Sequence, residues 1–152
     1  MFFLTFYALQ PLFAQNSNNY FQVLTNTGLN FNLDEPGDLE SGKTLTNAIT
    51  LRLKTKNQNC SVYARLYSYS APAGFYPSSS PLYLDWTGDN SNNVSNLVTT
   101  QNSIETYDKL LFTQPKSSTI YSYYYNLYLS PVGYDYPPGN YNFTLLFTMT
   151  QP

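Results

Sequence analysis

The sequence contains no histidine and a single cysteine, and these two shortages exclude most catalytic chemistry. Without histidine there is no Ser-His-Asp or Cys-His arrangement, no imidazole general base and no imidazole-ligated metal. Cys60 alone allows neither an internal disulfide nor a thiolate zinc site, and we expect it to be a small buried hydrophobic residue. We therefore expect a protein that is not an enzyme and that carries no cofactor.

Charged residues are also scarce. They make up 11% of the 152 residues, against about 25% in an average protein, and the seven Lys and Arg residues are scattered along the chain. Binding to nucleic acid or to an anionic membrane surface needs clustered basic side chains, so neither is expected. Because no apolar stretch is long enough to span a bilayer as a helix, we expect no membrane insertion.

The nine Asp and Glu residues lie mostly in predicted loops. Two carboxylates alone can hydrolyse a glycoside, but nothing in the sequence brings a pair together. Two acidic segments offer the oxygen ligands that Ca²⁺ prefers. Neither segment has the EF-hand spacing, so we interpret both as solvated turns. Their carboxylates are weak calcium candidates, namely Asp34, Asp38, Glu40 and Asp89.

Tyrosine and phenylalanine are abundant, with 16 Tyr and 10 Phe. Such residues fit the pleated, half-buried surface of a sheet, and ten Pro and seven Gly residues divide the chain at short intervals. The length suits one domain. We therefore expect an all-β fold, a single Ig-like antiparallel β-sandwich of about seven to nine strands.

Strand-like segments are separated by turn residues throughout the chain. They are 20–24, 29–33, 45–54, 61–69, 82–86, 119–129 and 140–150. Segment 34–38 is expected to be a turn and 90–96 a loop, whereas 104–112 fits either a strand or a short helical turn. Within 45–54, alternation places Leu45, Asn47, Ile49, Leu51 and Leu53 on the core side.

The last segment, 140–150, has the strongest apolar alternation. It is expected to point Tyr141, Phe143, Leu145, Phe147 and Met149 into the core, and Asn142, Thr144, Thr148 and Thr150 outward. Leu146 is an apolar residue on the outward side that needs cover from a loop or a partner. Because an exposed apolar edge promotes aggregation, we expect this segment to be a central strand.

The N-terminal segment Met1–Gln15 is apolar and uncharged, and a polar run begins at Asn16. This change is typical of the end of a secretory signal peptide, although no basic residue opens the segment and Leu12 stands where a small residue is preferred. The alternative is a first strand of the fold. We expect residues 1–15 to be a truncated signal peptide and 16–152 to form the domain, which makes the protein secreted or exposed at a cell surface.

Tyrosine occurs on both faces of segment 119–129, whereas an ordinary sandwich strand needs only one aromatic face. Tyr side chains offer a large contact area and a hydroxyl, which suits protein contacts or stacking on sugars. We predict a binding surface that includes Tyr63, Tyr67, Tyr69, Trp86, Tyr124 and Tyr128. Of these, Tyr63, Tyr67, Tyr124 and Tyr128 are expected to share one partly exposed face of neighbouring strands. The alternative is that the fold itself covers both faces.

The closing sequence Pro138-Gly139-Asn140-Tyr141 and the alternating strand after it resemble the end of spore-coat-protein-U-like and related Ig-like pilin and coat domains of secreted bacterial proteins. The segment from Gly42 to Leu45 fits the same layout. The chain departs from these domains in lacking their cysteine pair. The resemblance implies an Ig-like fold and a structural or adhesive role, and it carries over no catalytic residue.

These features favour a non-enzymatic extracellular subunit of a pilus, filament or coat, which assembles through strand edges and Tyr-rich faces. Its partners would be other proteins or further copies of itself. Adding a strand to a sheet edge supplies backbone hydrogen bonds without charge complementarity, which suits a chain with few charges. The alternative is a secreted carbohydrate-binding module that uses Trp86 and exposed tyrosines as a stacking platform.

Secreted protein is expected to begin near Gln15 or Asn16, because the sequence changes there from apolar to Asn-rich. N-terminal sequencing of secreted material measures this directly. An intact segment from Phe2 to Phe13 packed in the folded core would contradict the prediction.

Overall fold

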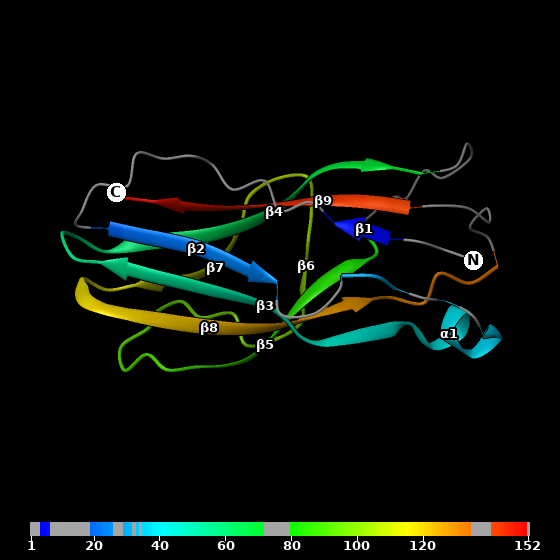
Figure 1. Cartoon of the computed structure of the whole chain (residues 1–152), viewed down its shortest axis with the longest axis horizontal. Coiled ribbons are helices and arrows are strands. Elements are labelled where there is room, and N and C mark those ends of the chain that lie inside the picture. Colours follow the sequence, from blue (N-terminus) through cyan, green and yellow to red (C-terminus); the bar gives the residue numbers. More distant parts are fainter. Residues whose placement is uncertain are drawn as a thin grey trace.

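The structure is a computed structural model that describes residues 4–6, 19–25, 29–31, 33, 35–71, 80–134 and 141–151. These residues form two sheets and one short helix (Figure 1). The elements are β1 (Leu4–Phe6), β2 (Asn19–Thr25), α1 (Pro36–Ser41), β3 (Lys43–Thr55), β4 (Cys60–Ser70), β5 (Leu82–Asp89), β6 (Asn102–Ser103), β7 (Lys109–Gln114), β8 (Ser117–Leu129) and β9 (Tyr141–Thr150).

The order of strands defines the two layers. One sheet, called here the β9 sheet, has the order β1-β9-β4-β7, and the other, the β8 sheet, has the order β2-β3-β8-β5-β6. All strand pairs are antiparallel except β1 with β9, which is parallel. The predicted all-β sandwich is therefore confirmed.

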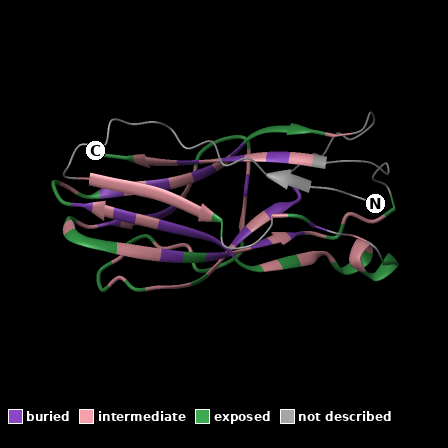
Figure 2. Ribbon diagram, viewed as in Figure 1, coloured by how far each residue is buried: buried purple, intermediate pink, exposed green. Residues whose placement is uncertain are grey.

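The core lies between the sheets and is built from alternate residues of the strands (Figure 2). In β4 the buried residues are Cys60, Val62, Ala64 and Leu66, and the residues between them are more exposed. Phe112 of β7 stacks on Tyr123 of β8, with ring centroids 3.8 Å apart, so this pair joins the two sheets directly. Cys60 is fully buried, as predicted, and burial raises the pKa of its thiol.

The outward and inward faces of β9 are as predicted for the described side chains. Phe143, Leu145 and Phe147 are buried, and Met149 packs against them at the end of the strand. The intervening residues Asn142, Thr144, Thr148 and Thr150 are partly or fully exposed, and so is Leu146. The side chain of Tyr141 lies outside the described residues.

The region before β3 differs from the prediction. Residues 29–31 are not a strand, yet Phe31 is fully buried. The expected turn at 34–38 is in part the start of α1, because Pro36 supplies a backbone angle suited to the first turn of a helix. Segment 104–112 contains no helix, and its second half belongs to β7. Apolar side chains can enter a core from irregular backbone, which alternation alone does not reveal.

A bulge in β3 changes which side chains reach the core. The register with β8 shifts between Leu45 and Ile49, and Asn47 has a positive φ of 50°. Asn47 was predicted to face the core, but it is exposed, and its backbone N–H donates to Asn126 Oδ1 at 2.8 Å. Ala48 is buried instead. The bulge shifts the alternation, so the prediction for Asn47 is wrong.

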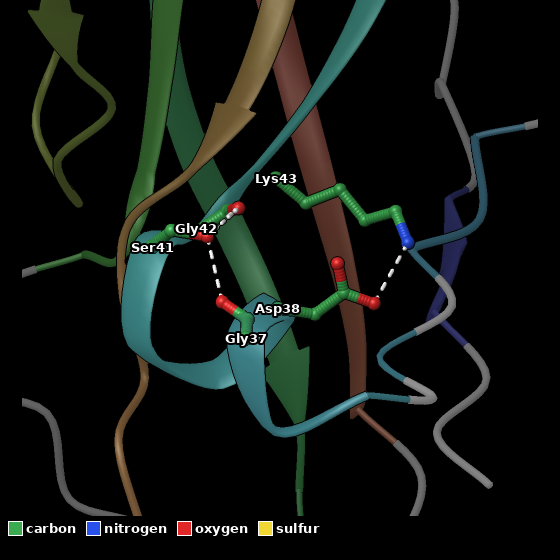
Figure 3. Close-up of polar contacts among 5 residues, drawn as sticks. All are labelled: Gly37, Asp38, Ser41, Gly42 and Lys43. Atoms are coloured by element: carbon green, nitrogen blue, oxygen red, sulfur yellow. Dashed lines mark hydrogen bonds and ion pairs between the residues drawn. The ribbon is translucent and has the colours of Figure 1, made fainter.

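The α1–β3 junction fixes the start of β3 (Figure 3). Lys43 Nζ lies 3.0 Å from Asp38 Oδ2, and Ser41 Oγ donates to the carbonyl of Gly37 at 2.6 Å. Between them Gly42 has φ 75° and ψ 179°, a conformation that is essentially restricted to glycine. A Cβ atom there would lie 2.4 Å from the carbonyl oxygen of Leu129.

Replacing Gly42 by alanine is expected to destabilise the protein. Backbone strain alone costs about 1–3 kcal/mol, and the clash of the new Cβ with the carbonyl oxygen of Leu129 adds to it. Gly37→Ala is the matched control, since a Cβ at Gly37 meets nothing within 4 Å and surface changes usually alter stability by less than about 0.5 kcal/mol. Urea unfolding of both variants measures the difference. Equal midpoints would contradict the assignment.

Candidate functional site

The outer side of β9 is one strand edge that the described residues define, and the end strand β2, seven residues long and likewise without charge or proline, is another. On its inner side, β9 pairs with β4 from Asn142 to Thr150. On its outer side, β1 pairs only with residues 141–143 (Figure 1). From Thr144 to Thr150, no strand among the described residues lies beside it. In the strand order β9 lies between β1 and β4, as predicted for a central strand, and among the described residues β1 accompanies it only at 141–143.

The opposite end of the β9 sheet is covered. Ser95 and Thr113 exchange two backbone hydrogen bonds of 2.9 and 2.8 Å, and Val98 N donates to the carbonyl of Leu111 at 3.0 Å. Segment 95–98 therefore runs along the free side of β7. In the β8 sheet, one end strand is β6, which is only two residues long, and the other is β2.

The β9 edge carries none of the residues that usually protect an exposed edge. Natural edge strands are commonly blunted by Lys, by Pro, by bulges or by a covering loop. From Tyr141 to Thr150 the sequence has no charged residue and no proline. The register with β4 is continuous from Thr150 to Leu145, so no bulge bends that part of the strand. No strand described by the structure pairs with the outer backbone groups of this stretch, which lie in a regular row.

The outer face beside this edge holds the tyrosines of β4. Tyr63 lies opposite Thr148, and Arg65 lies opposite Leu146, the apolar residue that was predicted to need cover. The Arg65 guanidinium lies 5.8 Å from the centroid of the Tyr67 ring, and its Nε lies 3.6 Å from Asp108 Oδ1. The residue Tyr67 is 56% exposed.

Tyr69 is displaced from this outer face by a second bulge. The register of β4 with β9 shifts between Leu66 and Ser68, which moves Tyr69 opposite the inward residue Phe143. The two rings lie 6.4 Å apart. Tyr69 nevertheless remains exposed, although Phe143 opposite it is buried.

Tyr124 and Tyr128 belong to β8 and therefore lie on the other sheet. The predicted partial exposure of the four tyrosines is confirmed, but the prediction that Tyr63 and Tyr67 share one face with Tyr124 and Tyr128 is wrong. Alternation along a strand separates inside from outside, and it does not say to which sheet a strand belongs.

The outer face of the β8 sheet has its own aromatic row. Tyr83, which the sequence analysis did not single out, lies opposite Tyr128 with ring centroids 5.9 Å apart. One step along the strands, Asp85 lies opposite Asn126. The next such pair is Gly88 with Tyr124, and a Cβ on Gly88 would meet nothing within 4 Å, so the space beside that ring is open.

Trp86 does not provide an exposed platform. It follows Leu82 and Leu84 on the inward side of β5 and packs partly against the core. Its Nε1 atom is buried and has no hydrogen-bond partner among the described residues. The expectation that Trp86 stacks on a sugar is therefore not supported by its position.

The calcium candidates do not converge. The Asp38 carboxylate pairs with Lys43, and Glu40 Oε1 accepts a hydrogen bond from the Tyr134 hydroxyl at 3.3 Å. Asp89 lies on β5, where its Oδ1 accepts hydrogen bonds from the backbone and hydroxyl of Ser91. Asp34 lies outside the described residues. No group of three potential metal ligands occurs among the side chains that the structure describes.

Two tyrosines of β8 place hydroxyl groups inside the sandwich. The Tyr123 hydroxyl donates to Gln114 Oε1 of β7, which is also buried. The Tyr125 hydroxyl is buried and has no hydrogen-bond partner among the described residues. Desolvation by burial raises the pKa of both hydroxyls well above the usual tyrosine value. Both groups are therefore neutral at ordinary pH and belong to the core.

Comparison with known proteins identified no relative of this chain. No protein-family model matches this sequence, and no curated protein matches it either. None of the described helices is long and apolar enough to cross a membrane. The fold defines the class of the protein, which is an all-β sandwich of two sheets. Its strand β9 is uncharged.

Replacing each buried tyrosine by phenylalanine should show that the two hydroxyls contribute differently to the stability of the protein. Tyr123→Phe leaves Gln114 Oε1 buried without its donor, so we expect a loss of about 1–3 kcal/mol in stability. Tyr125→Phe removes a buried hydroxyl that lacks a described partner, so we expect unchanged stability or a gain of about 1 kcal/mol. Urea unfolding at pH 7 measures both.

The hydroxyls of Tyr123 and Tyr125 should also affect how the stability of the protein depends on pH. Because folding raises both pKa values above about 10, the stability from the neutral hydroxyls is complete below pH 10 and falls as the pH rises further. Each Phe variant should lose stability less steeply than the parent between pH 10 and 11. Parallel curves for parent and variants would show that the hydroxyls are not desolvated.

Proposed function

We propose that this protein is a non-enzymatic, extracellular structural or adhesive subunit that joins further copies of itself by adding a strand to the β9 edge. The observation that carries the proposal is the outer side of β9 from Thr144 to Thr150, which is uncharged and has no strand partner among the described residues. The resemblance of segment 138–150 to secreted pilin and coat domains points to the same role.

Strand addition fits the chemistry of this edge. An added strand gains a row of backbone hydrogen bonds, and pockets for alternate side chains supply the specificity. The chain has too few charges to rely on electrostatic steering, since only 11% of its residues are charged. Backbone pairing needs no such charges.

A second copy of the chain is the favoured partner because a segment of this chain already pairs on that side. Leu4–Phe6 lies against Tyr141–Phe143 in parallel register. The first three residues of β9 therefore accept a strand of this sequence on that side. A strand that continued beyond Phe143 would also cover Leu146, beside Arg65 and Tyr67 on the same outer face.

Glycan binding is a second candidate function, and it is favoured by the aromatic row on the β8 sheet. Tyr83, Tyr128 and Tyr124 flank the polar pair Asp85–Asn126, which combines rings for stacking with hydrogen-bonding groups. Trp86 has no part in this candidate site. Loss of glycan-array binding in Tyr124→Ala would support it, and no binding by the parent would remove it.

Self-association through β9 is tested with two matched substitutions. Leu146→Lys puts a charge beside the open edge, and lysine is a residue that natural proteins use to blunt such edges. Ile120→Lys makes the same change at an exposed position of β8, away from that edge. We expect concentration-dependent oligomers of the parent, and at least a tenfold higher midpoint concentration for Leu146→Lys alone.

Sedimentation velocity over a range of concentrations measures these midpoints, and circular dichroism shows whether both variants remain folded. A parent that stays monomeric throughout would contradict the proposal. So would equal midpoints for the Leu146 and Ile120 variants, because the contact would then lie elsewhere.

A further inference from the structure

The outer face of the β8 sheet holds a pair of polar side chains that lie directly opposite each other, Asp85 of β5 and Asn126 of β8. Both are half-buried, and they alternate with the inward residues Leu84 and Leu127, so they lie on the side away from the core. Side chains that face each other in antiparallel strands have Cβ atoms about 4.5–5.5 Å apart. One ligand can therefore contact both.

The amide of Asn126 is oriented by a backbone hydrogen bond. The N–H of Asn47 donates to Asn126 Oδ1 at 2.8 Å, and the bulge in β3 presents this N–H. Because an N–H can donate only to the oxygen of the amide, the NH2 group of Asn126 remains as a donor for another partner. No acceptor for this group occurs in the described part of the chain. The bulge thus sets a hydrogen-bond donor on the outer face.

The carboxylate of Asp85 supplies the complementary group. It forms no ion pair and no hydrogen bond with the residues that the structure describes. A carboxylate only accepts hydrogen bonds, whereas the NH2 group of Asn126 only donates them. A hydroxyl group can do both. Two neighbouring hydroxyls of one ligand therefore match the pair, since one donates to Asp85 and the other accepts from Asn126.

Aromatic rings flank the polar pair at both ends. On one side, the rings of Tyr83 and Tyr128 have centroids 5.9 Å apart. On the other side is the exposed Tyr124, opposite Gly88, where a Cβ would meet nothing within 4 Å. Tyr124 and Tyr128 are four residues apart in one strand, about 13 Å. This row is longer than a single sugar ring, so it fits an oligosaccharide.

The charges of this face distinguish between classes of sugar. Asp85 would repel a carboxylate or sulfate group of an acidic sugar bound beside it. The basic residues that β3 contributes to the face, Arg52 and Lys54, lie toward its other end. Arg52 is opposite Ser122, which is four residues or about 13 Å from Asn126 along β8. Exposed charges at that separation are largely screened at physiological salt, so they do not offset the charge of Asp85.

We propose that the outer face of the β8 sheet binds a neutral oligosaccharide. Two neighbouring hydroxyls lie between Asp85 and Asn126, and the adjoining sugar rings stack on the tyrosines that flank this pair. The inference rests on the second candidate function, glycan binding, and specifies the class of glycan and the groups that recognise it. It is independent of assembly at β9, which belongs to the other sheet.

The test applies the full chain to an array of neutral oligosaccharides and their uronic-acid and sialylated counterparts. The strongest neutral oligosaccharide of the array is then titrated by calorimetry. We expect at least a tenfold preference for neutral glycans. Asp85→Asn should reduce this preference at least tenfold, because it removes the repelling charge. Asn126→Asp keeps an oxygen for the Asn47 N–H but removes the NH2 donor, so it should weaken binding at least tenfold.

Three further variants show which groups matter. Asp108→Asn makes the same change at an exposed carboxylate beside Arg65 of the other sheet, and should alter neither affinity nor preference. Tyr124→Phe keeps the ring and should bind like the parent, whereas Tyr124→Ala should bind at least tenfold more weakly. Circular dichroism shows whether all variants stay folded.

The outcomes separate this inference from the functions on which it bears. Equal binding of acidic and neutral glycans, or unchanged affinity in Asn126→Asp, overturns the inference but leaves glycan binding standing. No binding to any glycan of the array removes glycan binding and the inference with it, and leaves assembly at β9 untouched. If Tyr124→Ala instead raised the midpoint concentration for self-association, the face would contact a second copy, and the inference would again be overturned.

Discussion

The antiparallel pairing of β9 with β4 is the contact on which both the core and the proposed function depend. It holds Phe143, Leu145 and Phe147 between the sheets. Full burial of such side chains contributes about 1.5–3 kcal/mol each, so three of them approach the net stability of a small domain. The same pairing satisfies only one side of the β9 backbone. On the other side of this strand, the described residues place only β1, opposite residues 141–143.

Contacts between the sheets constrain the structure at a second level. Phe112 stacks on Tyr123, and Gln114 accepts the hydrogen bond of the Tyr123 hydroxyl, so β7 is tied to β8 by both apolar and polar contacts. A polar contact of this kind is worth more as a constraint than as a source of stability, because a mispacked arrangement would leave Gln114 and the hydroxyl buried without partners. It favours one alignment of the two sheets.

The sequence predicts the faces of regular strands well, since alternation follows directly from strand geometry. It correctly predicted the partial exposure of Tyr63, Tyr67, Tyr124 and Tyr128, and the buried and exposed sides of β9 for the described side chains. It failed at Asn47, where a bulge shifts the alternation, and at 29–33, where Phe31 enters the core from irregular backbone. Bulges depend on pairing with a distant partner, so a local pattern cannot locate them.

The candidate edge could not be read from the sequence for a related reason. Whether a strand is central or at an edge depends on sheet order, which places β9 between β1 and β4 although these lie far apart in the chain. The expectation that tyrosines of β4 and β8 share a face failed because those strands lie in different sheets. The side chains that each strand carries can be predicted from the sequence. Which strands lie side by side is known only from the order of strands in the two sheets.

The distribution of edge protection connects the fold with its proposed role. The free side of β7 is paired with Ser95 and Val98, and the β8 sheet ends on one side in the two-residue strand β6. Both arrangements limit pairing with other chains at that end of each sheet. The β9 strand has no charge and no proline, and in the described part of the chain β1 is the one strand on its outer side. A monomer that had to stay soluble by itself would gain from a single lysine there. Its absence fits the proposed pairing of this edge with a second copy, although the end strand β2 also lacks charge and proline.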